Sequence, residues 1–198
     1  PRHHTLRAAI DWSFVLLTPE EKTLFSRLAV FSAGLTLDMA EAVCSGDGMA
    51  AGRIIELLSS LVNKSLVVAH TIGRSQARYR LLETIREYAL EKLDEAGETA
   101  RLRDRHLDLF LARVEEAAPK LGEAYQQLWL NWLEDEHDNL RAALAWSLES
   151  GRIAEGLRIA SGLVRFWEIR GYIQEGMAWF ERFLPRADER VPPVVRVN

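Results

Sequence analysis

Residues 79–93, with the sequence YRLLETIREYALEKL, carry two hydrophobic periodicities in one short stretch. At its start, Tyr79 and Leu81 alternate with basic side chains, and a period of two is typical of a β-strand. Further along, the apolar residues recur at helical spacing: Leu82, Ile85, Ala89 and Leu93. The stretch therefore predicts a strand that passes directly into an amphipathic helix.

A β-hairpin is predicted immediately before this joint. Residues 65–69 favour a strand, residues 71–76 are polar and contain Gly73, and residues 78–82 form the return strand. Four helices are predicted upstream, at residues 5–17, 19–31, 36–44 and 53–62. This order is that of a winged-helix domain, in which the helix before the hairpin would enter a DNA major groove and the hairpin is the wing.

The start of the second helix has the clearest local signal in the chain. Thr18 suits the N-cap position, Pro19 suits the first helical position, and Glu21 completes a capping box. Thr36 is expected to cap the third helix in the same way.

The second half of the chain is predicted to be helical throughout. The polar residues 94–98 mark a domain boundary, so we expect a winged-helix domain at 1–95 and a helical domain at 96–198. The helices are expected at 101–117, 125–133, 135–150, 153–170 and 173–184, followed by an extended tail at Pro192 and Pro193. Antiparallel pairs of such helices indicate an α-solenoid, and the fold class is mainly α.

Residues 160–183 partly follow a tetratricopeptide-like pattern. Its first helix would be lined by apolar side chains, Gly171 would form the turn, and Gly176 would allow close contact in the second helix. The matching positions are Ala160, Leu163, Trp167, Gly171, Gly176 and Phe180. Val164 departs from the pattern, which has glycine there.

The charge distribution argues against autonomous DNA binding. The net charge is −4; residues 1–90 hold 10 Lys/Arg and 9 Asp/Glu, and residues 91–198 hold 15 and 20. Neither half is strongly basic.

No apolar run approaches the roughly 20 residues that span a bilayer. Cys44, the single cysteine, excludes an internal disulfide, so we expect a cytoplasmic location, and Pro1 in place of Met suggests a fragment of a longer protein.

Several ordered blocks together resemble a large bacterial group. They are LRAAIDWSFVLLTPEE, LFSRLAVFSAGLTLDMAEAVC, LLSSLVNKSLV, YRLLETIREYALEKL and EDEHDNLRAALAW. The chain resembles, over roughly residues 2–185, the signal-transducing NTPases of the STAND class, relatives of NB-ARC proteins that include many LuxR-family transcriptional regulators and predicted ATPases.

This resemblance implies a middle segment of a multidomain regulator. In that family an NTPase domain, which binds ATP or ADP, precedes the winged helix, and helical or tetratricopeptide repeats follow. An effector domain, often a DNA-binding helix-turn-helix, lies at one end. The present sequence has no G-x-x-x-x-G-K-[ST] phosphate loop, so we expect no enzymatic activity and no cofactor in it. Its expected partners are its own NTPase domain and a protein or small-molecule signal at the helical array, with DNA contacted through another domain.

The resemblance also suggests which residues face the NTPase domain. NB-ARC proteins have a nucleotide-sensing Met-His-Asp triplet where the strand enters the last helix of the winged-helix domain. Alignment on that helix places the triplet at Leu81, Leu82 and Glu83, of which only the acidic member is kept. Leu82 cannot donate a hydrogen bond to phosphate. Contact with the NTPase domain is therefore expected through Leu82, Glu83 and Arg86.

The alternative function is direct DNA binding by the winged helix. Arg74, Arg78 and Arg80, with His70 nearby, give the wing a basic character suited to phosphate contacts. The predicted recognition helix, in contrast, offers only Arg53 and Glu56 as charged groups, and its Ile and Leu residues are typical of a buried face. Docking of an NTPase domain fits this helix better than base readout does.

Four other features are weak candidates for sites. Residues 46–51 match a G-x-G-x-x-A fingerprint, but a helix precedes them where dinucleotide binding needs a strand. Glu134, Asp135, Glu136, His137 and Asp138 contain metal-ligating types, yet acidic residues at a helix start are also favoured by the helix dipole. His3 and His4 fit chain-end sequence, and Cys44 fits a buried thiol. No metal site is predicted.

Overall fold

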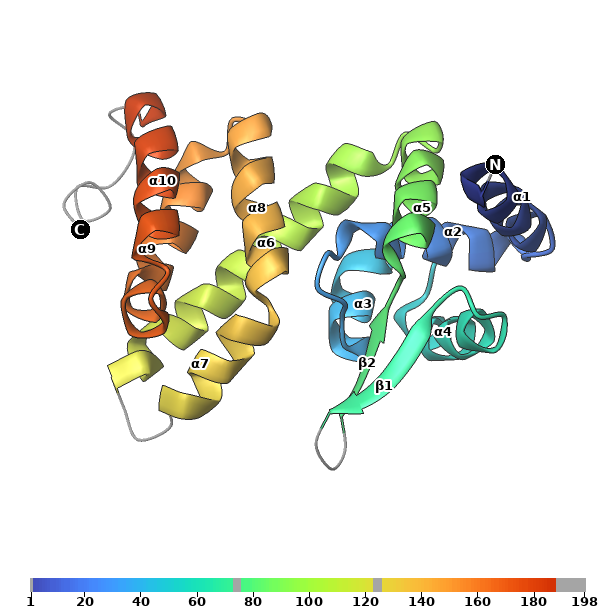
Figure 1. Cartoon of the computed structure of the whole chain (residues 1–198), viewed down its shortest axis with the longest axis horizontal. Helices are drawn as coiled ribbons and strands as arrows, with labels where there is room; N and C mark the ends of the chain where they lie inside the picture. The colour runs from blue at the N-terminus through green and yellow to red at the C-terminus, as the bar shows by residue number, and fades with distance from the viewer. Residues whose placement is uncertain (1, 73–75, 123–125, 188–198) are drawn as a thin grey trace. The chain divides into compact units, whose positions relative to one another are not determined.

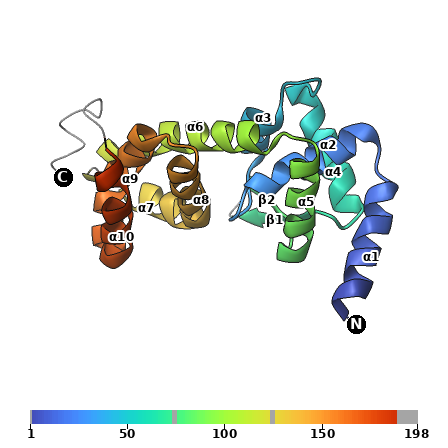
Figure 2. The ribbon, with the colours of Figure 1, turned by 90° about the horizontal axis from the view of Figure 1, so that it is seen from above.

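The computed structural model describes residues 2–72, 76–122 and 126–187, and the chain forms two compact units, Pro1–Arg105 and His106–Asn198 (Figures 1 and 2). The protein is mainly helical, with a winged-helix domain followed by a helical array, as predicted. The division lies within helix α6 (Thr99–Ala117), past the polar residues 94–98. The first turns of α6 belong to the first unit because their arginines bind Asp47 of that unit.

The first unit begins with four helices: α1 (Arg2–Val15), α2 (Pro19–Arg27), α3 (Leu37–Cys44) and α4 (Ile54–Asn63). The predicted capping box of α2 is confirmed: Thr18 Oγ1 accepts from Glu21 N at 3.3 Å, and Thr18 N donates to Glu21 Oε2 at 2.7 Å. α2 ends earlier than predicted, in the 3-10 turn Leu28–Val30, and the 3-10 turn Ala51–Arg53 precedes α4. Thr36 is the N-cap of α3, but its hydroxyl binds the Asp38 carboxylate instead of a backbone N–H.

The wing is an antiparallel pair, β1 (Val68–Ile72) and β2 (Gln76–Arg80), with Ala69 opposite Tyr79. β1 starts later than predicted because Leu66 N and Val67 N still donate to Leu61 O at the end of α4. A further bridge was not predicted: Leu35 and Tyr79 exchange two backbone hydrogen bonds of 2.8 Å. Gly34 permits this approach, since its φ is 89° and a Cβ there would lie 2.8 Å from Tyr79 O.

Helix α5 (Glu83–Glu95) leaves β2 directly and completes the core of the first unit. Its buried residues are Tyr88, Ala89 and Leu93. Phe14 of α1 lies between Phe25 and Tyr88, with ring centroids 5.7 and 5.6 Å away. The strand-to-helix joint predicted at residues 79–93 is thus present, and it places α5 against α2.

The second unit contains the 3-10 turn Ala118–Gly122 and four helices: α7 (Gln126–Asp135), α8 (His137–Glu149), α9 (Ile153–Arg170) and α10 (Ile173–Phe183), with a closing 3-10 turn Leu184–Arg186. α9 has its predicted bounds, and Gly171 ends it with a φ of 81°. The close contact predicted at Gly176 is present, because a Cβ there would lie 2.5 Å from the Trp167 ring. The predicted tail at Pro192 and Pro193 lies outside the described residues.

Candidate docking and nucleic-acid surfaces of the first unit

Helix α4 directs most of its large apolar residues into the core. Ile54, Leu57, Leu58 and Leu61 are buried. The outward positions are Ile55, Glu56, Ser59 and Asn63. This face carries one acidic and no basic side chain between residues 54 and 63, which is the reverse of what phosphate contact requires.

The two cations that flank α4 are both paired with acidic residues. Arg53 Nη2 lies 3.1 Å from Glu20 Oε2 and also binds Glu56. Lys64 Nζ donates to both oxygens of Glu21, each at 2.6 Å. Burial raises the pKa of Glu21, but hydrogen bonds from Lys64 and Ser60 outweigh it and lower that pKa to about 2. Neither cation is therefore available for DNA without losing a carboxylate partner.

Of the three arginines predicted to make the wing basic, the structure leaves Arg80 exposed on β2. Arg78 is only 7% exposed, and its Nη2 is 3.5 Å from Ala33 O. Its predicted role in phosphate contact conflicts with this burial: the guanidinium faces the loop before α3 because β2 also pairs with Leu35. Arg74 lies outside the described residues.

Leu82, Glu83 and Arg86 lie together at the start of α5. Leu82 is the N-cap residue and is 48% exposed, and its carbonyl accepts from Arg86 N at 2.8 Å. Arg86 Nη2 binds Glu83 Oε1 at 2.8 Å, and this hydrogen bond lowers the pKa of Glu83. Arg86 Nη1 also lies 3.4 Å from Ala29 O. The patch thus presents one apolar side chain beside a self-paired acid and base.

A second exposed surface on α1 was not predicted. Its inner face carries Ile10 and Phe14, which pack in the unit, whereas Trp12 is 68% exposed on the outer face. Val15, the last residue of α1, and Leu16, which follows it, are exposed as well. The spacing of positions 12, 15 and 16 is that of one helical face, so a count of both apolar faces of α1 would have found it. We call Trp12, Val15 and Leu16 the α1 outer face.

The weak sequence candidates do not form ligand sites. Residues 46–51 lie in the connection that follows α3, so no strand precedes them. His137 is buried, its Nε2 lies 3.2 Å from Glu175 Oε1, and burial lowers its pKa. Within residues 2–72, 76–122 and 126–187, no group of three or more His, Cys, Asp or Glu residues could hold a metal ion. Cys44 is buried, which raises its thiol pKa to about 12.

Comparison with known proteins assigns the fold of the first unit. Residues 17–94 match the family model of a winged helix-turn-helix domain. These residues form a winged helix-turn-helix domain. Helix α1 lies entirely before the matched region. No solved structure matches the chain.

Curated relatives extend the likeness to most of the chain. The chain is 45% identical over 183 residues to "Putative HTH-type transcriptional regulator Rv0890c" of Mycobacterium tuberculosis and to "Putative HTH-type transcriptional regulator Mb0914c" of Mycobacterium bovis. Each match covers 92% of this chain and 20% of the relative. The chain therefore spans about a fifth of the length of these relatives. Among the described helices, none has the length and hydropathy needed to cross a membrane.

Proposed function

We propose that this chain is a non-catalytic regulatory and protein-docking segment of a multidomain transcriptional regulator. Its winged-helix domain binds the nucleotide-binding domain of the same polypeptide, which holds ATP or ADP, and its helical array, of the tetratricopeptide type, receives a protein or small-molecule signal. The pairing of both cations that flank α4 with acids of α2 carries this proposal, because it leaves the helix suited to protein contact. The names of the relatives support the regulatory role.

Exposed apolar side chains on the first unit support docking to a protein. Large exposed apolar residues that cluster on one helix mark interaction surfaces more often than isolated ones do. The α1 outer face is such a cluster, and Leu82 adds an apolar side chain at the start of α5. Covering the Trp12 side chain would by itself remove a large aromatic surface from water, and this burial favours binding.

The position of the Leu82, Glu83 and Arg86 patch supports its role as a nucleotide-domain contact. Arg86 is half-buried and binds both Glu83 and a carbonyl of the 3-10 turn after α2, so its guanidinium is held in place. Leu82 has no polar group in its side chain, so we assign it apolar packing against the nucleotide-binding domain. The carboxylate of Glu83, which is exposed, is the group of the patch that can bind a cation of that domain.

A DNA titration of the 198-residue chain tests whether the winged-helix domain binds a protein domain or binds DNA. Fluorescently labelled duplexes should show no binding at about 50 mM salt. Arg53 and Lys64 are paired with carboxylates, so they do not neutralise DNA phosphates and displace no counterions from them. Binding whose affinity falls steeply with salt would overturn the proposal. In that event Arg80→Gln should reduce the salt dependence, whereas Arg158→Gln, at an exposed position of α9, should not.

Substitutions in the full-length regulator test the docking partner. Leu82→Ala and Arg86→Ala should speed the release of a fluorescent nucleotide from the nucleotide-binding domain, because each loosens the docked state. Glu87→Gln, an exposed change on the same helix, is the matched control and should leave the release rate unchanged. Wild-type release rates in both Leu82→Ala and Arg86→Ala would contradict the proposal.

A second candidate function is direct DNA binding by the winged-helix domain. Two observations favour it: the relatives are named as HTH-type regulators, and Arg80 is exposed on the wing. The titration above separates the two functions, since only this one requires affinity that decreases with salt.

A further inference from the structure

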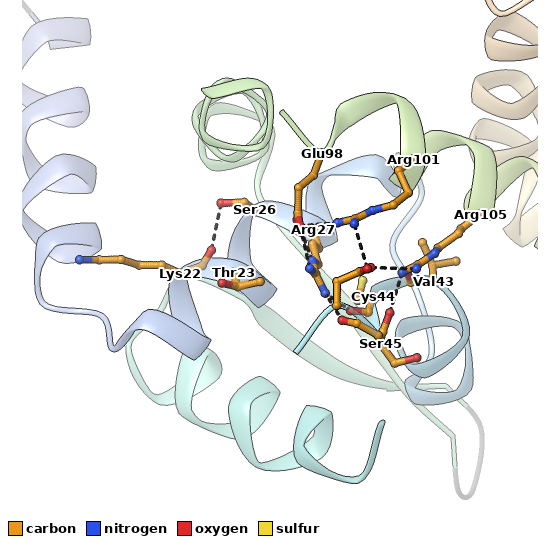
Figure 3. Close-up of polar contacts among 12 residues, drawn as sticks. Lys22, Thr23, Ser26, Arg27, Val43, Cys44, Ser45, Glu98, Arg101 and Arg105 are labelled. Carbon is orange, nitrogen blue, oxygen red and sulfur yellow. Dashed lines mark hydrogen bonds and ion pairs between the residues drawn. The ribbon is translucent and has the colours of Figure 1, made fainter. Parts of the chain in front are cut away.

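Three arginines converge on the end of α3 (Figure 3). Arg27 comes from the last turn of α2, and Arg101 and Arg105 come from the first turns of α6. The last carbonyl groups of a helix have no partner within it, and the negative end of the helix dipole favours cations there. We call Arg27, Arg101 and Arg105 the arginine clamp.

The carbonyl oxygens of four successive residues, 43 to 46, alternate between two of these arginines. Arg105 Nη1 lies 3.5 Å from Val43 O and 2.6 Å from Ser45 O. Arg27 Nη1 donates to the carbonyls between them, at 2.8 Å to Cys44 O and 2.9 Å to Gly46 O. The end of α3 is therefore held from two sides, by α2 and by α6.

Arg27 forms the buried part of the clamp. Its side chain is 1% exposed, and its Nε and Nη2 donate to the two oxygens of Glu98, each at 2.8 Å. Glu98 immediately precedes α6, and the bidentate hydrogen bond from Arg27 lowers its pKa. A fully buried arginine is uncommon and persists here because a carboxylate and two carbonyls satisfy it.

Arg101 and Arg105 form the part of the clamp that is open to solvent. Arg101 Nη1 lies 3.0 Å from Asp47 Oδ1, and Arg105 Nη2 lies 2.9 Å from Asp47 Oδ2. All three side chains are about one third exposed, at 40%, 32% and 38%. Ion pairs with this exposure are weak and exchange readily with water. The outer part can therefore open while the buried pair of Arg27 and Glu98 stays intact.

The clamp acts on a turn of unusual conformation. Gly46, Asp47 and Gly48 have φ values of 85°, 53° and 89°, so three successive residues lie in the left-handed region. Asp47 is the one that pays a steric penalty there, and it is also the residue that Arg101 and Arg105 bind. The turn leads through Ala51–Arg53 into α4.

We propose that Arg101 and Arg105 make the first turns of α6 a positioning element for the turn between α3 and α4. A force or partner that displaces α6 withdraws these arginines from Asp47 and from the carbonyls at the end of α3. The turn then loses the contacts that hold its left-handed residues, and the start of α4 becomes mobile. α6 is a single helix that continues into the second unit, so it offers a covalent route from the helical array to α4.

Hydrogen exchange of the 198-residue chain tests this role. Arg101→Gln combined with Arg105→Gln should speed exchange in residues 45–53 about five- to tenfold, the change expected for losing two or three weak ion pairs. Exchange in the cores of α2 and α5 should stay at the wild-type rate, because Arg27 and Glu98 remain. Arg113→Gln, which removes an arginine further along the same helix, should leave residues 45–53 unchanged.

A second variant tests whether α6 transmits the effect. Ala112→Gly places glycine at an exposed position of α6 after the clamp and loosens the helix. It should raise exchange in α6 itself and, about twofold, in residues 45–53. Faster exchange in α6 with an unchanged turn would overturn transmission. If the double arginine variant raised the exchange rate uniformly throughout the first unit, Arg101 and Arg105 would only stabilise the fold. That result would overturn their proposed role in positioning the turn.

Discussion

Both units join distant helices through ion pairs, such as that of Arg141 with Glu175 in the second unit, but they differ in the most closely packed contacts between their helices. In the first unit, charged side chains join distant elements: Arg27 binds Glu98 across 71 residues, and Lys64 binds Glu21 across 43. In the second unit, glycines let large side chains approach a neighbouring helix. A Cβ on Gly156 would overlap Phe183, one on Gly162 would overlap Val114, and one on Gly176 would overlap Trp167.

This difference separates contacts that a partner can exchange from contacts that it cannot. Ion pairs depend on pH and salt and can be exchanged for pairs with a partner. Contacts between a glycine and an aromatic ring depend on shape alone, so they tolerate little displacement. The partly exposed ion pairs of the winged-helix unit are therefore contacts that a docked domain could alter, whereas the glycine contacts of the helical array resist displacement.

The largest expected effect comes from the buried ion pair of the first unit. Arg27→Met should lower the free energy of unfolding by about 3–5 kcal/mol, because Glu98 loses its bidentate partner and keeps only the partly exposed Arg101, and two carbonyls lose a donor. Urea unfolding followed by circular dichroism measures it. The double variant Arg27→Met with Glu98→Leu should recover part of the loss, since the carboxylate that lost its buried partner is removed as well. A loss below about 1 kcal/mol in the single variant would show that charge does not hold this unit together.

The pH dependence of the first unit should come in part from Glu21. Its pKa of about 2 in the folded state lies below the ordinary value of 4.5. A lowered carboxyl pKa stabilises the fold above the ordinary value, and this stability is lost as the pH falls from about 4.5 toward 2.

Glu21→Gln should therefore destabilise the chain by about 2–3 kcal/mol at pH 7 and by progressively less as the pH approaches 2. Urea unfolding at several pH values measures the difference. Glu20→Gln is the matched control, because Glu20 and its partner Arg53 are both exposed. A loss for Glu21→Gln that is constant with pH would remove the ionic explanation, because glutamine keeps the capping role of the side chain.

The shape-based contacts of the second unit predict a smaller, pH-independent effect. Gly176→Ala should destabilise the array by about 1–3 kcal/mol, because the new methyl overlaps the Trp167 ring. The destabilisation from this overlap exceeds the stabilisation from alanine's higher helix propensity. Gly52→Ala is the control, since a Cβ there meets nothing within 4 Å. Thermal unfolding at pH 7 and at pH 5 should show the same loss. Equal stability of Gly176→Ala and the parent chain would mean that the helices of the array can shift apart.

Local signals in the sequence predicted much of this fold. The capping box of Thr18 and Glu21 spans three residues, so its geometry follows from the helix start alone. The bounds of α9 follow from its apolar periodicity and from Gly171. The contact at Gly176 was predicted from its place in a repeat pattern, although its partner Trp167 lies on the preceding helix.

Contacts between distant residues were not predictable in this way. The bridge between Leu35 and Tyr79 requires the hairpin to fold back onto the loop before α3, and that packing also buries Arg78. Arg27 is one of many arginines in the sequence, and nothing local marks it as buried beside Glu98. Of the proposed docking residues, Leu82, Glu83 and Arg86 came from resemblance, whereas the α1 outer face was not predicted although its spacing is present in the sequence.

The smallest expected effect separates the two parts of the arginine clamp. Asp47→Asn keeps a residue that tolerates the left-handed region but removes the charge that Arg101 and Arg105 bind. Because these pairs are partly exposed, the variant should lose only about 0.5–1 kcal/mol at low salt, and the difference from the parent chain should vanish near 1 M salt. Gly176→Ala should show no such convergence, since no charge is involved. If the deficit of Asp47→Asn persisted at 1 M salt, the Asp47 carboxylate would be acting as a hydrogen-bond acceptor that shapes the turn, and the outer part of the clamp would be as permanent as the buried pair of Arg27 and Glu98.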